Sequence, residues 1–153
     1  MMILANTSSE LREQLLSEHA GLRRLMAICE QEARRILIGE SSSRHLLACV
    51  LQLIHAVESH NFSEEEALRP VLLDTDSFGS VRVEQMMEDH IAEHVWLRQV
   101  MRDAVEQEVP DRAARAALDA MQLLRDHMDA EEQQFLNDRV LKDDLMPIDT
   151  STG

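Results

Sequence analysis

The stretch VEQMMEDHIAEHVWLRQVMRDA, residues 83–104, decides the fold. Apolar or histidine residues recur in it at steps of four and three, the spacing that keeps one side of an α-helix against its neighbours in a bundle. Its inward positions are Val83, Met87, His90, His94, Leu97, Met101 and Ala104. The stretch therefore predicts a bundle helix with two histidines on its buried side.

Three further stretches carry the same spacing. Their inward positions are Leu15, His19, Leu22, Met26, Cys29, Ala33 and Ile36 in the first, Leu46, Val50, Leu53, Val57, His60 and Glu64 in the second, and Ala113, Ala117, Ala120, Leu124, His127 and Glu131 in the last. The capping box Thr7–Glu10 and the stop signal Gly39 predict a helix at about 8–38. Other capping and helix-breaking residues predict helices from the capping serines 41–43 to 69, at 81–108 and at 112–137, with a loop at 74–80. Pro70 is expected to end the second helix.

Length and composition agree with a single helical domain. A chain of 153 residues lies within the usual size of one domain. It has four glycines, three prolines, no tyrosine and only 3% aromatic residues, whereas strands favour aromatic residues and need frequent turns. We expect an all-α protein, an up-down-up-down four-helix bundle at 8–137, followed by an acidic C-terminal tail at 138–153.

The charge of the chain excludes several classes of partner. A formal net charge of -14 repels nucleic acid and anionic lipid surfaces. The sequence has no apolar run of the roughly 18–20 residues needed to cross a bilayer, and its start resembles no signal peptide. We therefore expect a cytoplasmic protein that binds neither nucleic acid nor membrane.

The two cysteines, Cys29 and Cys49, are too few and too far apart for a disulfide scaffold or a thiolate metal site. We interpret them as small apolar packing residues. Since Gly39 lies midway between them, a hairpin there would bring them to a similar height, and a redox pair is the alternative.

Seven polar residues occupy positions that the bundle should bury. They are His19, His60, His90, His94, His127, Glu64 and Glu131. At about 1.5 Å per residue, the histidines lie roughly 14–20 Å and the glutamates roughly 8–9 Å from the same end of an up-down-up-down bundle. We therefore expect one cluster and not scattered core histidines. His45 and His55 lie off the inward positions and are expected on the surface.

Nitrogen and oxygen ligands without thiolate favour a redox-active iron pair over a structural zinc site in the bundle core. No histidine has a glutamate three residues before it, as ferritin-like di-iron bundles require, and the HExxH motif is absent. Two octahedral irons have about twelve coordination positions. Five imidazoles, two bridging carboxylates and one oxo or hydroxo bridge would leave about one position open for a small molecule.

Four ordered motifs resemble the hemerythrin and HHE cation-binding family. They are EHAGLR at 18–23, HNFSEEE at 60–66, HIAEH at 90–94 and HMDAEE at 127–132. The resemblance covers about residues 9–137. An internal echo accompanies it, because EHAGLRRLM at 18–26 matches EHVWLRQVM at 93–101 and an HxxxEE segment follows each.

The resemblance implies two non-haem irons with an oxo or hydroxo bridge. One iron would be held by His90, His94 and His127, the other by His19 and His60, with Glu64 and Glu131 bridging. Oxygen-carrying hemerythrins place an aspartate five residues after the last histidine, where this chain has Glu132. Because a spacing of four keeps Glu131 inward, we predict Glu131 as the ligand and keep Glu132 as the alternative.

Three functional hypotheses remain. The first is a metal- and oxygen-binding protein that reversibly binds O₂ or a related small molecule for storage, delivery or sensing. The second is a di-iron enzyme or iron-handling protein that acts on peroxide, NO or damaged iron centres. The third is a metal-free helical interaction module whose histidines only pack in the core. Metal analysis separates the third hypothesis from the others, and peroxide turnover separates the second from the first.

Overall fold

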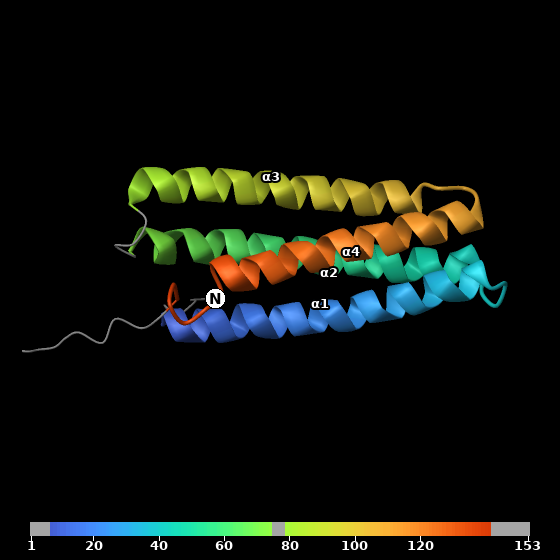
Figure 1. Ribbon diagram of the computed structural model, residues 1–153, viewed down its shortest axis with the longest axis horizontal. Coiled ribbons are helices and arrows are strands. Elements are labelled where there is room, and N and C mark those ends of the chain that lie inside the picture. The colour runs from blue at the N-terminus through green and yellow to red at the C-terminus, as the bar shows by residue number, and fades with distance from the viewer. Residues whose placement is uncertain (1–6, 75–78, 142–153) are drawn as a thin grey trace, which may run out of the picture.

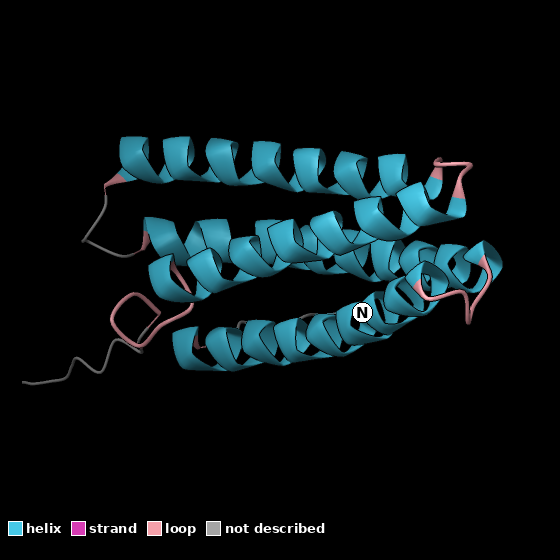
Figure 2. Ribbon diagram, turned by 45° about the vertical axis from the view of Figure 1, so that its right-hand side comes forward, coloured by secondary structure: helices cyan, strands magenta, loops and turns pink. Residues whose placement is uncertain are grey.

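Four antiparallel helices form the protein in a computed structural model that describes residues 7–74 and 79–141. Their bounds are Ser8–Leu37 for α1, Ser43–Leu73 for α2, Ser80–Val105 for α3 and Pro110–Gln134 for α4. The helices run up-down-up-down (Figure 1), and α1 and α3 each pack against both α2 and α4. The described residues contain no strand (Figure 2), so the predicted all-α bundle is confirmed.

The start and end of α1 follow the predicted signals. Thr7 and Glu10 form the expected capping box, in which the Glu10 amide donates to Thr7 Oγ1 at 3.1 Å and the Thr7 amide donates to Glu10 Oε2 at 3.2 Å. At the other end Gly39 adopts a φ of 77°, a left-handed conformation that glycine tolerates without steric cost. These two devices fix the length of the helix.

The end of α2 differs from the prediction, because the helix continues through Pro70 to Leu73. Proline removes one helical hydrogen bond, which usually ends a helix. Here the extra turn buries Leu72 beside Leu68 in the core, at 0% and 1% exposure. Packing of this apolar side outweighs the local preference. The other bounds shift by up to three residues, and α4 begins at Pro110 because proline fits the first helical turn.

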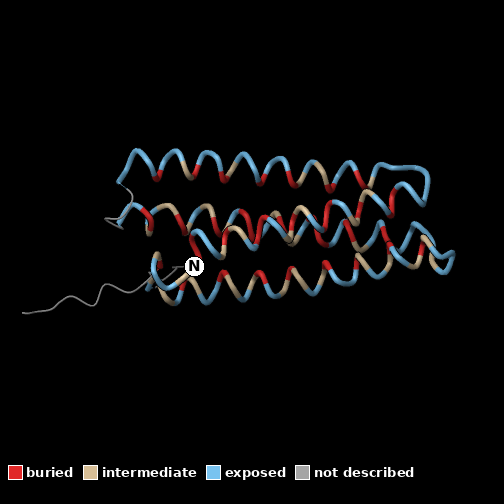
Figure 3. Tube along the Cα trace, in the orientation of Figure 1, coloured by how far each residue is buried: buried red, intermediate tan, exposed pale blue. Residues whose placement is uncertain are grey.

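The core has two apolar clusters, one on each side of the seven predicted polar residues. The larger contains Leu22, Val57, Leu97 and Leu124 with their neighbours, and the smaller contains Leu15, Leu68 and Met87 among others. Buried positions face the interior along all four helices (Figure 3). A polar layer therefore interrupts an otherwise apolar core.

The segment after α4 packs against the smaller cluster through Phe135, Leu136 and Leu141, all of which are buried. Residues 142–153 of the expected tail and residues 75–78 of the expected loop lie outside the described residues. No described helix is both long enough and apolar enough to span a membrane. Cys29 is buried, Cys49 is half-buried, and both are free thiols.

Candidate metal centre

All seven inward polar residues meet in the middle layer of the bundle. Each is at most 6% exposed. Their ligand atoms form two groups in which every pair lies within 4.8 Å, and Glu131 belongs to both. The groups are His90, His94, His127 and Glu131, and His19, His60, Glu64 and Glu131. His45 and His55 are exposed, as predicted.

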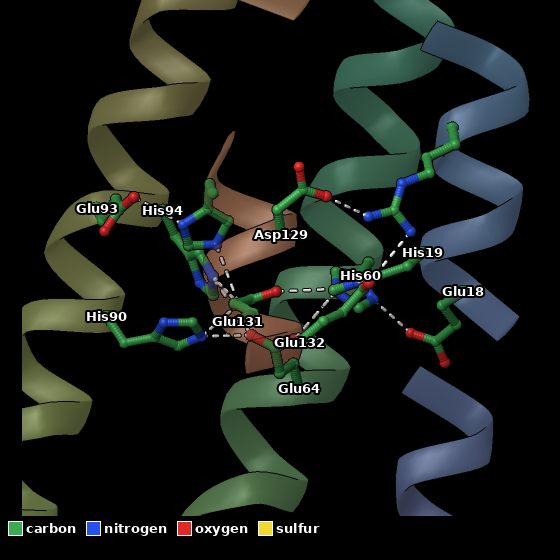
Figure 4. A network of polar contacts seen from close by, with 12 residues as sticks. Glu18, His19, His60, Glu64, His90, Glu93, His94, Asp129, Glu131 and Glu132 are labelled. Carbon is green, nitrogen blue, oxygen red and sulfur yellow. Dashed lines mark hydrogen bonds and ion pairs between the residues drawn. The ribbon is translucent and has the colours of Figure 1, made fainter. Parts of the chain in front are cut away.

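The two buried carboxylates span the groups (Figure 4). Glu131 approaches Nε2 of His19 at 2.9 Å through one oxygen and Nε2 of His90 at 2.7 Å through the other. Glu64 approaches Nε2 of His60 at 3.2 Å through Oε2, and its Oε1 contacts Nε2 of His90. Each carboxylate thus faces imidazoles of both groups, as a ligand bridging two ions would.

Several of these atoms are buried without a hydrogen-bond partner among the described residues. They are Nε2 of His19, His60 and His127, Oε2 of Glu64 and Oε1 of Glu131. A buried polar atom left unsatisfied costs about 1–3 kcal/mol. Atoms that converge at short distance without hydrogen-bond geometry suit coordination to a shared ion. The residues therefore fit a metal site with nitrogen and oxygen ligands.

A second set of four glutamates orients the histidines from outside. Nδ1 bonds to a carboxylate in His60–Glu18 at 2.6 Å, His94–Glu65 at 2.6 Å, His127–Glu93 at 2.8 Å and His19–Glu132 at 2.8 Å. Such a partner holds the proton on Nδ1 and leaves Nε2 free to bind metal. These contacts therefore fix the orientation of four of the five imidazole rings.

These outer contacts form a closed ring around the bundle. A glutamate on each helix bonds to a histidine on the next: Glu18 on α1 to α2, Glu65 on α2 to α3, Glu93 on α3 to α4, and Glu132 on α4 back to α1. Glu18, Glu65 and Glu93 were not predicted from the sequence. Each is next to an inward residue and so points about 100° away from it, onto a face where a charged residue is ordinary, so the apolar period does not single it out.

His90 differs from the other four histidines. Its close carboxylate contacts use Nε2, and no described carboxylate bonds to its Nδ1. Its ring stands edge-on to Phe135, with centroids 5.6 Å apart. Phe135 was not predicted as a site residue from the sequence. His90 is therefore oriented by packing and not by an outer carboxylate.

The buried cluster shifts the pKa values of its members. Burial alone would lower the pKa of His19 and His94, yet contacts with the surrounding carboxylates raise both to about 10. The same opposition raises the pKa of His90 to about 9. Burial would raise the pKa of Glu64 and Glu131, but the histidines around them lower it. Without metal the layer therefore holds protons on imidazole and charge on carboxylate.

Glu131 and Glu132 have different surroundings. The Glu131 side chain is 4% exposed and faces both histidine groups. The Glu132 side chain is 28% exposed and bonds to Nδ1 of His19 from outside. The inward position predicted for Glu131 is thus where the structure places it. Glu132 lies among the outer glutamates.

Residues 10–137 match the family model of the hemerythrin HHE cation-binding domain. No curated protein and no solved structure matches the chain. The matched range contains all seven inward residues and the four outer glutamates.

Proposed function

Because the chain belongs to the hemerythrin HHE cation-binding domain family, we propose that it holds two non-haem irons, with an oxo or hydroxo bridge, and reversibly binds O₂ or a related small molecule. The observation that carries this proposal is the set of buried, unpartnered Nε2 and carboxylate atoms that converge in two groups. A single octahedral ion has six positions, which is fewer than seven ligand residues require.

The residues divide into two ligand sets. His90, His94 and His127 would hold one iron, His19 and His60 the other, and Glu64 and Glu131 would bridge the pair. Iron supplies a reversible change of oxidation state and an exchangeable coordination position. The outer glutamates would keep Nδ1 of His19, His60, His94 and His127 protonated, so that these four imidazoles bind as neutral ligands through Nε2.

The open position would belong to the iron with two imidazoles. Leu15 stands one turn before His19, is fully buried and cannot bind metal. It packs with Leu68 and Met87 in the smaller apolar cluster. These side chains exclude water from that end of the site, which disfavours the escape of charged, partly reduced oxygen species. A storage, delivery or sensing role is therefore preferred to an enzymatic one.

The test is metal analysis with an absorption spectrum. After anaerobic reconstitution with ferrous iron, about two irons per chain are expected. Exposure to air should then give near-ultraviolet and visible charge-transfer bands that azide changes. One metal per chain or a preference for zinc would contradict the proposal. Sustained peroxide turnover would replace reversible binding with the enzymatic role.

A further inference from the structure

The outer contacts of the two histidine groups are not equivalent. On the His19 side, Glu132 accepts a hydrogen bond from Arg23 Nη1 at 2.7 Å as well as its bond with His19. The second arm of the same guanidinium donates to Asp129 Oδ1 at 2.9 Å (Figure 4). The guanidinium is therefore fixed at two points before it reaches the carboxylate that orients His19.

The internal echo supplies a natural comparison for this arrangement. Arg23 corresponds to Arg98, Glu132 to Glu65, and Asp129 to Phe62. Glu65 bonds to His94 as Glu132 bonds to His19. However, Phe62 is apolar and 69% exposed, and within the described ranges no ion pair joins Arg98 to a carboxylate. The guanidinium clamp is thus built on one side of the centre alone.

The clamped side is also the side with fewer imidazoles. His19 and His60 are the two histidines of one group, whereas the other group has three. Loss of orientation at one imidazole removes half of the nitrogen ligands on the first side and a third on the second. A contact that orients His19 should therefore affect ion retention more than the same contact would at His94.

We propose that Arg23, held by Asp129, is a positioning residue for the ion on the His19 side, acting through Glu132. This rests on the proposed di-iron function. Arg23 orders the Glu132 carboxylate, Glu132 orders the His19 ring, and the ring keeps Nε2 directed at the ion. The competing explanation is that Arg23 only stabilises the packing of α1 against α4. Exposed ion pairs contribute little to stability, which disfavours that explanation.

The test compares Arg23→Gln with Arg98→Gln, its matched control in the echo. Each variant is loaded with two irons, and release is followed with a ferrous chelator after reduction. Removal of an outer partner of a metal-binding histidine typically costs about 10–100-fold in affinity. Arg23 acts one contact farther out, so about 3–10-fold faster release of one iron is expected in Arg23→Gln. Arg98→Gln should release both irons as the wild type does.

A double variant separates positioning from fastening. If Arg23 acts through Glu132, adding Arg23→Gln to Glu132→Gln should not accelerate release beyond that of Glu132→Gln alone. Multiplied effects would overturn the proposal, because they would place the role of Arg23 outside this chain of contacts. Asp129→Asn, which leaves the Arg23–Glu132 pair in place, should accelerate release of the same iron to a smaller extent.

The outcomes distinguish this inference from the function beneath it. If the wild type does not load two irons, the proposed di-iron function fails. If two irons load but Arg23→Gln releases both at the rate of Arg98→Gln, only the positioning role fails. Helix content and melting of the metal-free variants complete the test. If the free-energy change calculated from faster iron release equals the loss of stability of the metal-free variant, Arg23 only stabilises helix packing and the positioning role fails.

Discussion

Leu15 and His90 occupy equivalent places in the two halves of the molecule. Each stands one helical turn before a buried histidine, His19 or His94, and each is itself buried, at 0% and 6% exposure. Around them the halves match, with the same EH pair, the same HxxxEE segment and the same outer glutamates. The two halves thus share most of their polar frame and differ at one equivalent inward position, which carries an imidazole in one half and a leucine in the other.

The largest expected effect removes the residue that both groups share. Glu131→Ala takes a ligand from each ion at once, so iron content should fall from about two to below about one per chain. Glu132→Ala, the matched control one residue away, should retain more than half of the iron because it removes only an orienting contact. Metal analysis after identical reconstitution measures both variants. A larger loss of iron in Glu132→Ala would identify Glu132 as the ligand and contradict the role of Glu131 as the residue shared by both groups.

Metal removal should have the next largest effect, since the proposed ions would take ligands from both halves. A ligand at a thousand times its Kd stabilises a fold by about 4 kcal/mol. For a chain of this size that corresponds to a loss of about 8–16 °C in Tm on chelation. Thermal unfolding followed by circular dichroism measures it. The Glu131→Ala variant should lose less of its Tm on chelation than wild type does, and equal Tm values for wild type in both states would exclude a site coupled to folding.

Leu15→His would make the two halves alike. The new imidazole should fill or crowd the open position, so azide affinity should fall by about tenfold or more while about two irons remain bound. Leu15→Met keeps the volume without adding a nitrogen ligand at this place, and its azide affinity should stay near the wild-type value. Spectral titration of the diferric proteins gives both affinities. Unchanged azide binding in Leu15→His would assign the open position to the other iron.

The smallest effect expected is the pH dependence of the metal-free protein. The pKa of His19 and His94 is raised from 6.5 to about 10, and that of His90 to about 9. Their contribution to stability is fully present below about pH 6.5 and is lost as the pH rises through 9 to 10. Because the same two carboxylates support all three, the contributions are not additive. We expect a fall of about 3–6 °C in Tm between pH 6.5 and 9.

The lowered pKa of Glu64 and Glu131 has the opposite sign. Their contribution is present above about pH 4.5, the ordinary value, and is lost as the pH falls below it. Metal-free protein should therefore be most stable between about pH 4.5 and 6.5. A Tm that rises steadily from pH 6.5 to 9 would contradict the conclusion that the buried histidines of the metal-free protein are protonated.

The sequence was sufficient to predict the site residues on the inward side of each helix but not those on the outward side. His19, His60 and Glu64 stand out because a polar residue at a bundle position violates the apolar period. Glu18 and Glu65 carry no such violation, since charged residues are ordinary on an exposed face. Their role appears only when the neighbouring helix is placed, because each contact crosses from one helix to the next.

Helix ends were predicted where the signal is local and missed where packing decides. The Thr7–Glu10 capping box is written in four residues and was confirmed. Pro70 is a local stop signal that burial of Leu72 overrides. The placement of Phe135 against His90 depends on how the chain turns after α4, which no periodic pattern describes.

The closed ring of outer glutamates also constrains how the helices can slide. Each helix both gives a carboxylate to one neighbour and receives one from the other. A shift of any helix by one residue moves it about 1.5 Å and turns its contacts by about 100°, which breaks two of the four bonds together. Apolar layers of leucine and methionine tolerate such slippage far better. The polar layer near the middle of the bundle therefore fixes the axial register of the four helices. It favours one alignment over those shifted by a residue.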